Sequence, residues 1–326
     1  MAILVTGGAG YIGSHMVLAA LDRGRDVVVL DNLSTGVRSL VDERAHFHLG
    51  NAGDPALLGE LFRRYAITAV IHFAGSIVVP ESVANPLAYY QNNTVVSRAL
   101  IEACVAAGVK HFIFSSTAAV YGIPEHNPVT EKTETAPINP YGRSKLMTEW
   151  MLQDTARAHD FRYVVLRYFN VAGADPGGRS GQSTPNATHL IKRACQAALG
   201  RVPALDIFGT DFPTRDGTGV RDYIHVSDLV GAHALALDHL EQGGPPTLLN
   251  CGYGHGFSVR EVIDTVSKVV GQKIPTREGP RRPGDPPALV ADSSQLHAQF
   301  GWQPKYDNLE EIVSTAYSWE RRFNSA

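Results

Sequence analysis

A glycine-rich turn near the start of the chain constrains the fold more than any other feature. The turn Gly7–Gly13 follows the apolar run Ile3–Thr6 and leads into a helix-like segment, Ile12–Arg23. Glycines permit a tight turn and let backbone N–H groups approach a pyrophosphate, which the N-terminus of a helix also attracts. Asp31 ends the next strand, Val27–Leu30, about where an acid that binds the cofactor ribose is expected. The pattern predicts a dinucleotide site, with an ordinary strand-end turn at Asp31 as the alternative.

The carboxylate of Asp31 also distinguishes between two cofactors. It can accept hydrogen bonds from ribose hydroxyls and repels a 2′-phosphate, so the sequence favours NAD over NADP.

Short apolar segments alternate with helix-like segments through the first half of the chain. The expected strands are Ile3–Thr6, Val27–Leu30, His46–Leu49, Ala69–Phe73, His111–Ser115 and Tyr163–Arg167. The expected helices include Ile12–Arg23, one that begins at Pro55, Pro86–Ala107 and Pro140–His159. Continuous apolar strands separated by helices indicate a parallel sheet covered on both faces. We therefore predict an α/β protein with a Rossmann-type doubly wound parallel sheet.

The composition of the chain changes after about residue 172. Loops become rich in Gly and Pro, and helix-like segments are fewer, at 188–199, 227–240, 258–270 and 309–323. Ser258 and Glu261 have the spacing of a capping box. We expect an NAD-binding domain over 1–172 and a smaller C-terminal α/β substrate domain over 173–326, with segments that can cross back.

Composition excludes several classes of function. The 326 residues carry 29 basic and 32 acidic side chains, for a net charge of −3, which gives no reason to expect a nucleic-acid partner. The three cysteines are scattered and form no metal-binding pattern, so we expect no metal and a reducing compartment. No apolar stretch could span a membrane, and the first strand begins at Ile3. The expectation is a soluble, cytoplasmic protein.

A tyrosine and a lysine downstream suggest proton chemistry. Tyr141 and Lys145 lie four residues apart, on one face of an expected helix. A free tyrosine has a pKa of about 10, and a nearby ammonium together with a positive nicotinamide would lower it. A surface Tyr/Lys pair is the common alternative. The hydroxyl run Ser115–Thr117, which closes an apolar strand at the edge where the nicotinamide should lie, favours the catalytic interpretation.

These motifs together resemble the extended short-chain dehydrogenase/reductase superfamily and, within it, the UDP-glucose 4-epimerase family. The likeness covers nearly the whole length. It rests on GGAGYIGSH at 7–15, DNLSTG at 31–36, HFAG at 72–75, PLAYYQNN at 86–93, FSSTAAVYG at 114–122, NPYGRSKLMTE at 139–149, LRYFNVAGA at 166–174 and DGTGVRDYIHVSDL at 216–229. The last two blocks are much more specific than the glycine turn.

The resemblance implies a role for each matching position. The catalytic residues would be Tyr141 as the base, Thr117 with Ser116 holding the sugar 4-oxygen, and Lys145 binding the nicotinamide ribose. The cofactor residues would be Gly7, Gly10, Tyr11, Ile12, Gly13, Asp31, Asn32, Phe73, Ala74, Gly75, Asn92, Ser115, Tyr141, Lys145 and Tyr168. The substrate residues would be Thr117, Tyr141, Phe169, Asn170, His189, Leu190, Arg221, Tyr223, Arg282, Asp285 and Leu289.

The implied reaction is reversible epimerisation at C4 of UDP-glucose and UDP-galactose, through a 4-keto intermediate and transient reduction of bound NAD. Related 4,6-dehydratases carry an Asp-Glu pair after the threonine, where this chain has Ala118 and Ala119, so dehydration is disfavoured. An epimerase or decarboxylase acting on UDP-uronates, a plain alcohol dehydrogenase and a non-catalytic NAD(H)-binding regulator stay open as alternatives. The family also suggests a homodimer formed through the helices at 86–107 and 140–159.

Five positions, at four sites, depart from the family pattern. Ile77 stands where some members carry a lysine that touches the cofactor, and Asn51-Ala52 replaces an Asp-Ile or Asp-Leu pair beside the adenine. His189 replaces an asparagine, and a surface histidine at a helix start is as good an interpretation as a diphosphate ligand. Leu289 aligns with a gate that is tyrosine in enzymes strict for glucose and galactose. Because leucine is shorter, the sequence predicts some activity on UDP-GlcNAc and UDP-GalNAc.

Overall fold

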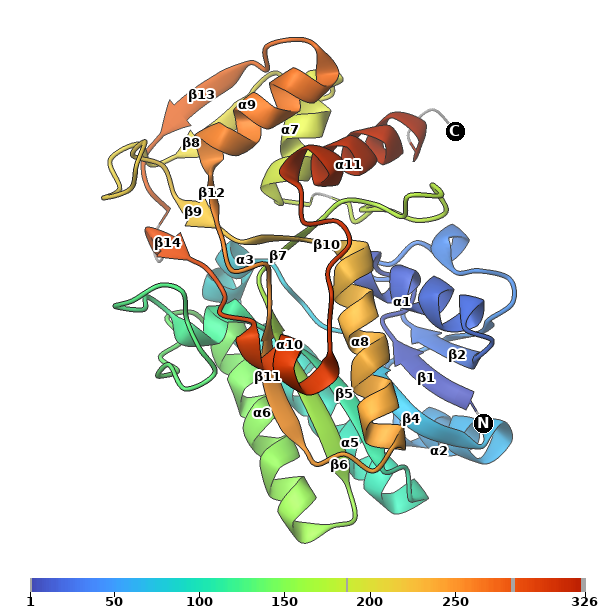
Figure 1. The fold of residues 1–326 in the computed structure, drawn as a ribbon. Helices are drawn as coiled ribbons and strands as arrows, with labels where there is room; N and C mark the ends of the chain where they lie inside the picture. The colour runs from blue at the N-terminus through green and yellow to red at the C-terminus, as the bar shows by residue number, and fades with distance from the viewer. Residues whose placement is uncertain (1, 186, 283–284, 324–326) are drawn as a thin grey trace. The chain divides into compact units, whose positions relative to one another are not determined.

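The computed structural model describes residues 2–185, 187–282 and 285–323 (Figure 1). The chain divides into two compact units, each built from three segments. Unit 1 comprises Met1–Val120, Pro137–Arg167 and Val230–Leu249, and unit 2 comprises Tyr121–Ala136, Tyr168–Leu229 and Asn250–Ala326. Compared with a single division at residue 172, the segments 121–136, 168–172 and 230–249 thus belong to the other unit.

Unit 1 is built on a seven-stranded sheet with the order β11-β6-β5-β4-β1-β2-β3. Its strands are β1 Ala2–Thr6, β2 Asp26–Asp31, β3 His46–Leu49, β4 Ile67–His72, β5 His111–Thr117, β6 Arg162–Tyr168 and β11 Thr247–Cys251. Strand β1 pairs in parallel with both β2 and β4, so the strand order reverses at β1. The prediction of a Rossmann-type doubly wound sheet is confirmed, and a ligand is expected at the carboxyl ends of the strands at this reversal.

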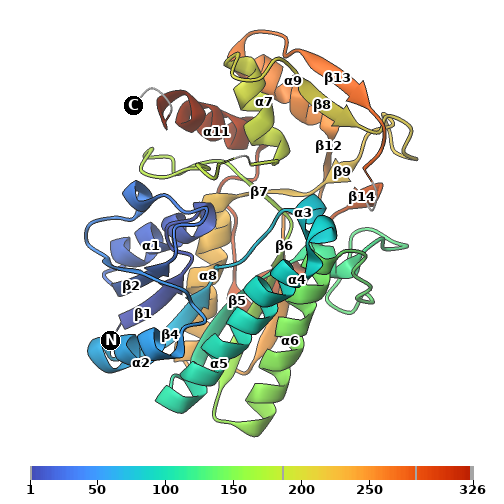
Figure 2. The same cartoon turned by 180° about the vertical axis from the view of Figure 1, so that it is seen from behind.

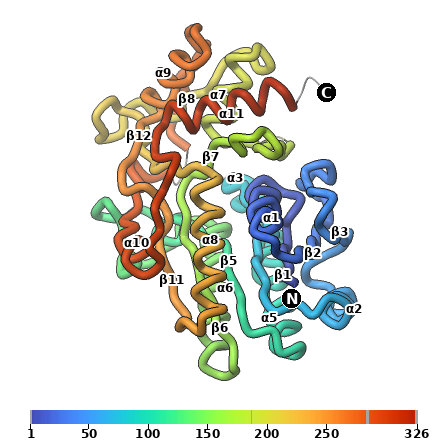
Figure 3. The backbone as a smooth tube through the Cα atoms, turned by 45° about the vertical axis from the view of Figure 1, so that its right-hand side comes forward, coloured from blue at the N-terminus to red at the C-terminus, as the bar shows by residue number. Residues whose placement is uncertain are grey.

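Helices cover both faces of this sheet. Figure 1 shows α1 (Tyr11–Asp22) and α8 (Val226–Glu241) on one face. Ion pairs link the residues after α1 to α8, with 2.5 Å between Arg23 and Asp238 and 2.6 Å between Arg25 and Glu241. The opposite face carries α2 (Pro55–Tyr65), α5 (Val96–Ala107) and α6 (Pro140–Ala158), as Figure 2 shows. The central strands are therefore buried on both sides, which explains their continuous apolar sequences. Figure 3 shows β3 beside β2 at the outer edge.

The segment expected as one helix over Pro86–Ala107 is interrupted. It begins as α4 (Pro86–Tyr89), passes through a π-helical turn, η2 (Tyr90–Val95), and continues as α5; a short α3 (Val79–Ala84) precedes it. The wide turn carries Asn93, whose buried amide accepts from the Ser76 N–H and donates to the Ser76 carbonyl and the Ser144 hydroxyl. Such π-turns often occur at functional sites.

Unit 2 has a separate apolar core formed by three helices, α7 (Leu190–Ala198), α9 (Val259–Val270) and α11 (Leu309–Phe323), which Figure 1 shows together with β8 and β13. The capping box predicted for Ser258 and Glu261 is present at the start of α9. The remaining elements are η1 Arg38–Leu40 and η3 Ala118–Tyr121, α10 Ser294–Phe300, and the strands β7 Asn170–Ala172, β8 Leu205–Phe208, β9 Val220–Arg221, β10 Tyr223–His225, β12 Phe257–Ser258, β13 Thr276–Gly279 and β14 Ala288–Leu289. These strands form small sheets, β10-β7, β13-β8 and β12-β9-β14.

Candidate active site

The glycines of the first turn have different structural roles. Gly7 has φ of +73°, and a Cβ there would lie 2.6 Å from the Ala74 nitrogen, while a Cβ on Gly13 would lie 2.1 Å from the Gly7 carbonyl oxygen. Both are therefore required for backbone packing. A Cβ on Gly10 would meet only the Gly7 carbonyl oxygen, at 3.2 Å. Gly10 is the N-cap of α1, and no side chain of the described residues caps that end by a hydrogen bond. The backbone N–H groups of this first turn can therefore serve an anion.

Asp31 is held in place at the end of β2. One carboxylate oxygen accepts from the Ala9 N–H at 2.9 Å and the other from the Leu33 N–H at 2.8 Å. Each oxygen keeps a further lone pair for a ribose hydroxyl. Asn32, next to it, is exposed. The open helix N-terminus and the fixed carboxylate thus fit the pyrophosphate and the ribose of a dinucleotide.

The other residues expected around the cofactor follow the ends of neighbouring strands. Phe73, Ala74 and Gly75 continue from β4, and the N–H groups of Phe73 and Ala74 both donate to the Thr6 carbonyl at the end of β1. Asn92, in the π-turn, donates to the Ser76 hydroxyl at 2.8 Å. Ser115 lies in β5, while Tyr11 and Ile12 open α1. Parallel strands end at one edge, so the fold gathers these positions. Tyr168 is the last residue of β6, although the division of the chain assigns it to unit 2.

Tyr141 lies in the first turn of α6, close to the end of β5. The N-cap Asn139 accepts from the Gly142 N–H at 2.9 Å, and a Cβ on Gly142 would lie 2.6 Å from the Ala119 carbonyl oxygen. This close approach brings the Tyr141 phenol within hydrogen-bonding reach of the Thr117 hydroxyl. Tyr141 is partly exposed, so an incoming hydroxyl group can approach it.

Lys145 is buried one helical turn after Tyr141. Its ammonium donates to the Ser115 carbonyl at 3.0 Å and lies 4.9 Å from the centre of the Phe114 ring. Burial lowers the pKa of Lys145 to about 8, and the negative charge of Glu149 opposes that shift. Tyr141, Lys145 and Thr117 are thus brought together, as the sequence predicts for these three residues.

The expectation of an acidic Tyr141 phenol combines the Lys145 ammonium with a positive nicotinamide, and it stays a prediction. Burial raises the pKa of Tyr141 above its ordinary value, and the Thr117 hydrogen bond lowers it only in part. Desolvation of the phenolate therefore outweighs the Thr117 hydrogen bond. A positive nicotinamide would supply the further charge that the prediction requires.

Sequence reasoning missed two residues behind this site. Glu149 and Arg167 form a buried ion pair, and Ser116 donates its hydroxyl to Glu149. Both stand in the motif blocks at 139–149 and 166–174, but nothing in the sequence indicates that they meet. Ser116 faces this pair, so its expected part in holding the sugar oxygen stays a prediction.

Unit 2 gathers most of the expected substrate residues through strand pairing. Asn170 is the register partner of Tyr223 in the β7–β10 pair, and Arg221 is the partner of Leu289 in the β9–β14 pair. The Arg221 guanidinium lies 3.8 Å from the Asp285 carboxylate, and burial lowers its pKa. The Asn170 N–H and its side-chain amide both donate to the carbonyl of Asp222, the residue after Arg221; Phe169 directly precedes Asn170 in the chain.

Three further candidates lie at other points of unit 2. The Arg282 guanidinium is 3.9 Å from the centre of the Phe208 ring. His189 and Leu190 lie at the start of α7, where the His189 ring is 3.3 Å from the Gln182 amide nitrogen. Burial lowers the pKa of His189 to about 4, so its imidazole is neutral near pH 7 and can donate one hydrogen bond.

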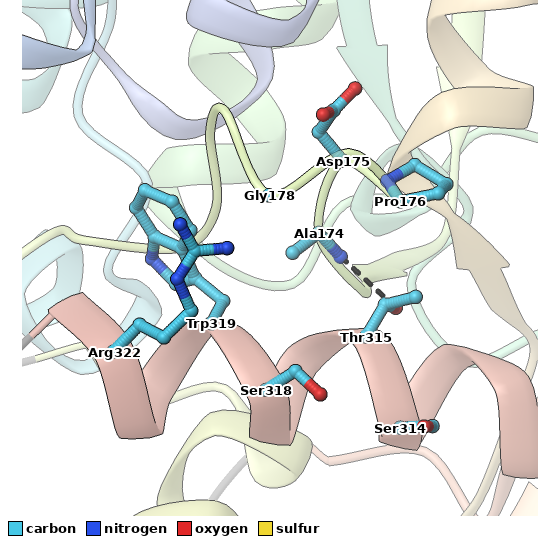
Figure 4. A pocket seen from close by; sticks show the side chains of 9 residues that line it. All are labelled: Ala174, Asp175, Pro176, Gly178, Ser314, Thr315, Ser318, Trp319 and Arg322. Carbon is cyan, nitrogen blue, oxygen red and sulfur yellow. Dashed lines mark hydrogen bonds between the residues drawn. The ribbon is translucent and has the colours of Figure 1, made fainter.

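The loop after the RYFN block is anchored to α11 around a cavity of about 260 Å³ (Figure 4). The Ala174 N–H donates to the Thr315 hydroxyl at 3.2 Å, and the Trp319 indole donates to the Ser183 hydroxyl at 3.2 Å. None of the residues expected to bind cofactor or substrate lines this cavity. Its side chains fix the loop that follows Asn170.

None of the described helices combines the length and the hydropathy of a membrane span. The described side chains also include no group of three or more His, Cys, Asp or Glu residues that could hold a metal ion.

Comparison with known families decides the class. A model of the NAD dependent epimerase/dehydratase family matches residues 3–252, well over half of the chain. The chain belongs to this family. The family's cofactor is NAD, in agreement with the glycine turn and the carboxylate of Asp31. The sheet and the glycine turn are thus those of the NAD dependent epimerase/dehydratase family.

Individual members of the family match the chain over almost its whole length. A UDP-glucose 4-epimerase from Azospirillum brasilense is 58% identical, over 98% of this chain and 92% of its own. The crystal structure of UDP-glucose 4-epimerase from Brucella ovis in complex with NAD is 45% identical, with a TM-score of 0.95 and 98% of each chain covered. The UDP-Glc/GlcNAc 4-epimerase of Campylobacter jejuni is 47% identical, with a TM-score of 0.86, covering 98% of this chain and 99% of its own.

Proposed function

We propose that this epimerase-family chain interconverts UDP-glucose and UDP-galactose by inverting C4 of the hexose through a 4-keto sugar nucleotide. The observation that carries the proposal is the Tyr141 phenol, hydrogen-bonded to Thr117 at the end of β5 with the Lys145 ammonium one helical turn away. This is the arrangement needed to oxidise and reduce a secondary alcohol. The relatives above, which bear the name UDP-glucose 4-epimerase, support the choice of substrate.

The protein's residues divide the work of the reaction. Bound NAD supplies the hydride acceptor and donor. Tyr141 takes the proton of the 4-hydroxyl and later returns it, while Thr117 holds the oxygen that loses and regains that proton. Lys145 stabilises the phenolate, whose formation burial opposes. A positioned proton-transfer group of this kind contributes roughly 10²–10⁴-fold to the rate.

The substrate nucleotide is assigned to unit 2. Arg221 and Arg282 provide the cations for a diphosphate, since a guanidinium matches that charge and geometry. Asn170 and Tyr223 lie beside Arg221 through strand pairing and contact the uridine diphosphate in this proposal. The NAD-binding role falls to unit 1 and the sugar-nucleotide role to unit 2.

Inversion rather than dehydration is favoured by the residues after Thr117. Ala118 and Ala119 provide no acid or base, so elimination of water from the sugar lacks a proton carrier at these positions. UDP-uronates are the competing substrates, because they would use the same Tyr141 and Lys145.

Leu289 extends the proposal to N-acetylated sugars. Its side chain is buried next to Arg221 in the β9–β14 pair, and leucine leaves more room than tyrosine. The relative named UDP-Glc/GlcNAc 4-epimerase supports this extension. We expect Leu289→Tyr to lower the rate on UDP-GlcNAc relative to UDP-galactose; Leu289→Met is the volume-matched control. An unchanged ratio of the two rates in Leu289→Tyr would remove Leu289 as the gate.

A homodimer is the proposed assembly, formed through unit 1. Large apolar side chains are exposed along α3, α4, η2 and α6, namely Val83, Leu87, Val95, Met147 and Trp150. α6 packs against α3, α4 and η2 (Figure 2), and a partner copy covers these exposed side chains in this proposal. Trp150→Glu should convert a dimer to a monomer in light scattering. The three free, buried cysteines agree with a reducing compartment such as the cytoplasm.

One assay tests the central proposal. The purified protein is incubated with UDP-galactose without added NAD, and UDP-glucose is measured by chromatography, together with absorbance at the wavelength of NADH. We expect UDP-glucose to form with no accumulation of free NADH, because the hydride is returned. Stoichiometric NADH formation with added NAD would indicate a dehydrogenase instead. Turnover of UDP-galacturonate in preference to UDP-galactose would reassign the substrate.

A further inference from the structure

A buried ion pair lies directly behind the catalytic residues. The Glu149 side chain, on α6, is fully buried, and Arg167, on β6, is almost as inaccessible. Arg167 contacts the carboxylate through two nitrogens, Nε at 3.0 Å from Oε1 and Nη2 at 2.5 Å from Oε2. Burying two charged groups carries a desolvation penalty that burying a hydrophobic pair of the same volume does not, so this ion pair is weak evidence for a role in stability. The residues that it contacts indicate a different role.

The first neighbour is the strand end that carries Thr117. Ser116 donates its hydroxyl to Glu149 Oε1 at 2.5 Å. On one side of Ser116, the Ser115 carbonyl accepts from the Lys145 ammonium; on the other stands Thr117, which hydrogen-bonds Tyr141. The carboxylate therefore fixes the middle of a three-residue segment whose two ends hold the catalytic lysine and tyrosine.

The second neighbour is Lys145, four residues before Glu149 on the same face of α6. The titratable groups that face Lys145 are Tyr141 and Glu149 on its own helix and His72 on β4, with Arg167 of β6 behind Glu149. Burial lowers the pKa of His72 to about 3, so His72 is neutral at working pH. Glu149 is thus the anion among the described residues whose charge counters the desolvation of Lys145.

We propose that Glu149 is a positioning residue of the epimerase reaction. Its buried carboxylate fixes the Thr117 segment through Ser116 and keeps Lys145 in the cationic form, while Arg167 allows the carboxylate to stay ionised in the interior. The inference rests on the proposed function, in which Lys145⁺ and Thr117 serve Tyr141.

The first test is Glu149→Gln, which keeps the shape and removes the charge. We expect the pKa of Lys145 to fall by at least about one unit, since a neighbouring carboxylate shifts a pKa by roughly 1–3 units. The Lys145 Cε resonance, assigned by its loss in Lys145→Arg, reports this value by NMR in the absence of turnover. In a plot of kcat against pH, the apparent pKa of the high-pH limb should fall by the same amount, while KM for UDP-galactose stays unchanged.

Two further variants separate the two roles. Ser116→Ala removes the link to the Thr117 segment and leaves the charge, so kcat should fall about 3- to 10-fold, the effect of one hydrogen bond, without moving the high-pH limb. Glu149→Asp keeps the charge but shortens the side chain. The apparent pKa of the high-pH limb should therefore stay unchanged, while kcat falls. The matched control is Glu320→Gln in unit 2, another buried carboxylate paired with a cation, which should change thermal stability and leave the limb in place.

The outcomes distinguish this inference from the proposed function. If the wild-type protein does not convert UDP-galactose, the proposed function fails, whereas the Lys145 titration still tests the electrostatic role of Glu149. An unchanged Lys145 pKa in folded Glu149→Gln overturns that role. If Glu149→Gln does not fold, the Lys145 pKa is measured in Glu149→Asp instead. A fall in that pKa as large as the fall expected for Glu149→Gln would contradict the electrostatic role, because aspartate keeps the charge. A normal kcat in Ser116→Ala overturns the positioning of Thr117.

Discussion

The two units hold their candidate site residues in different ways. In unit 1, Thr117 and Lys145 are buried on regular elements, and both are fixed by hydrogen bonds within the segment 115–117 and its neighbours. In unit 2, Arg221 and Leu289 lie on strands of only two residues, and Asp285 lies in a loop. The Arg221–Asp285 separation of 3.8 Å is long for a charged hydrogen bond. Proton transfer requires fixed geometry, whereas binding a flexible diphosphate tolerates adjustable side chains. Substitutions of the proton-transfer residues in unit 1 should therefore lower kcat, whereas substitutions of the binding residues in unit 2 should raise KM.

The largest expected effect is that of Tyr141→Phe. Without the proton carrier, kcat should fall by roughly 10²–10⁴-fold while circular dichroism and KM stay close to the wild-type values. Lys145→Arg serves as a control, because it keeps the cation and the phenol. Turnover within a few-fold of wild type in Tyr141→Phe would contradict the assignment of unit 1 to the chemistry.

Glycine substitutions should separate packing from ligand binding within unit 1. Gly13→Ala places a methyl group against the Gly7 backbone carbonyl, so the free energy of unfolding in urea should fall by about 3 kcal/mol. Gly10→Ala meets the same oxygen at 3.2 Å and should cost about 1 kcal/mol or less. NAD binding, measured by calorimetry, should nevertheless weaken in Gly10→Ala, since its methyl group obstructs the open end of α1. Equal stability losses in both would refute the distinction.

Arg221→Ala should affect binding and leave the chemistry intact. Loss of a hydrogen bond to a charged group costs about 1.5–3 kcal/mol, so KM for UDP-galactose should rise by roughly 10- to 100-fold with kcat near normal. Arg260, whose exposed side chain pairs with Glu278, is the surface control and should show no change on substitution by alanine. A fall in kcat with unchanged KM would assign Arg221 to the chemical step and would contradict the proposed difference between the two units.

The smallest expected effect is an acid sensitivity carried by His72 in unit 1. Its ring is buried between Thr6 and Ser97, and burial lowers its pKa from 6.5 to about 3. Because the folded pKa lies below the unfolded value, this contribution to stability is complete above pH 6.5 and is lost as the pH falls toward 3. At pH 5 the loss from His72 alone is about 2 kcal/mol. His72→Gln should flatten this part of the urea-unfolding profile; an equally steep profile would assign the effect elsewhere.

Contiguous motifs made the fold of unit 1 and the placement of Tyr141 and Lys145 predictable from the sequence. The glycine turn, Asp31 and the Tyr141–Lys145 spacing each depend on residues close together in the chain, and local rules of turns and helices act at that range. The interruption of the helix after Pro86 was missed, because the π-turn depends on Asn93 bonding to Ser76 and Ser144, which lie far away in sequence. The acidic phenol expected of Tyr141 stays a prediction, because burial, which the sequence does not state, raises the pKa of that phenol in the protein alone.

The sequence by itself determined the sheet, the dinucleotide turn and the Tyr141–Lys145 pair, because hydrophobic periodicity, glycine conformation and helical spacing are properties of neighbouring residues. Tertiary structure alone decided that Glu149 meets Arg167 and Ser116, and that Arg221 lies beside Leu289. These contacts join separate strands and helices, so they exist only once the register of the strands and the packing of the helices are fixed. Burial then raises the pKa of Tyr141 and lowers that of Lys145, through the cost of removing a charge from water.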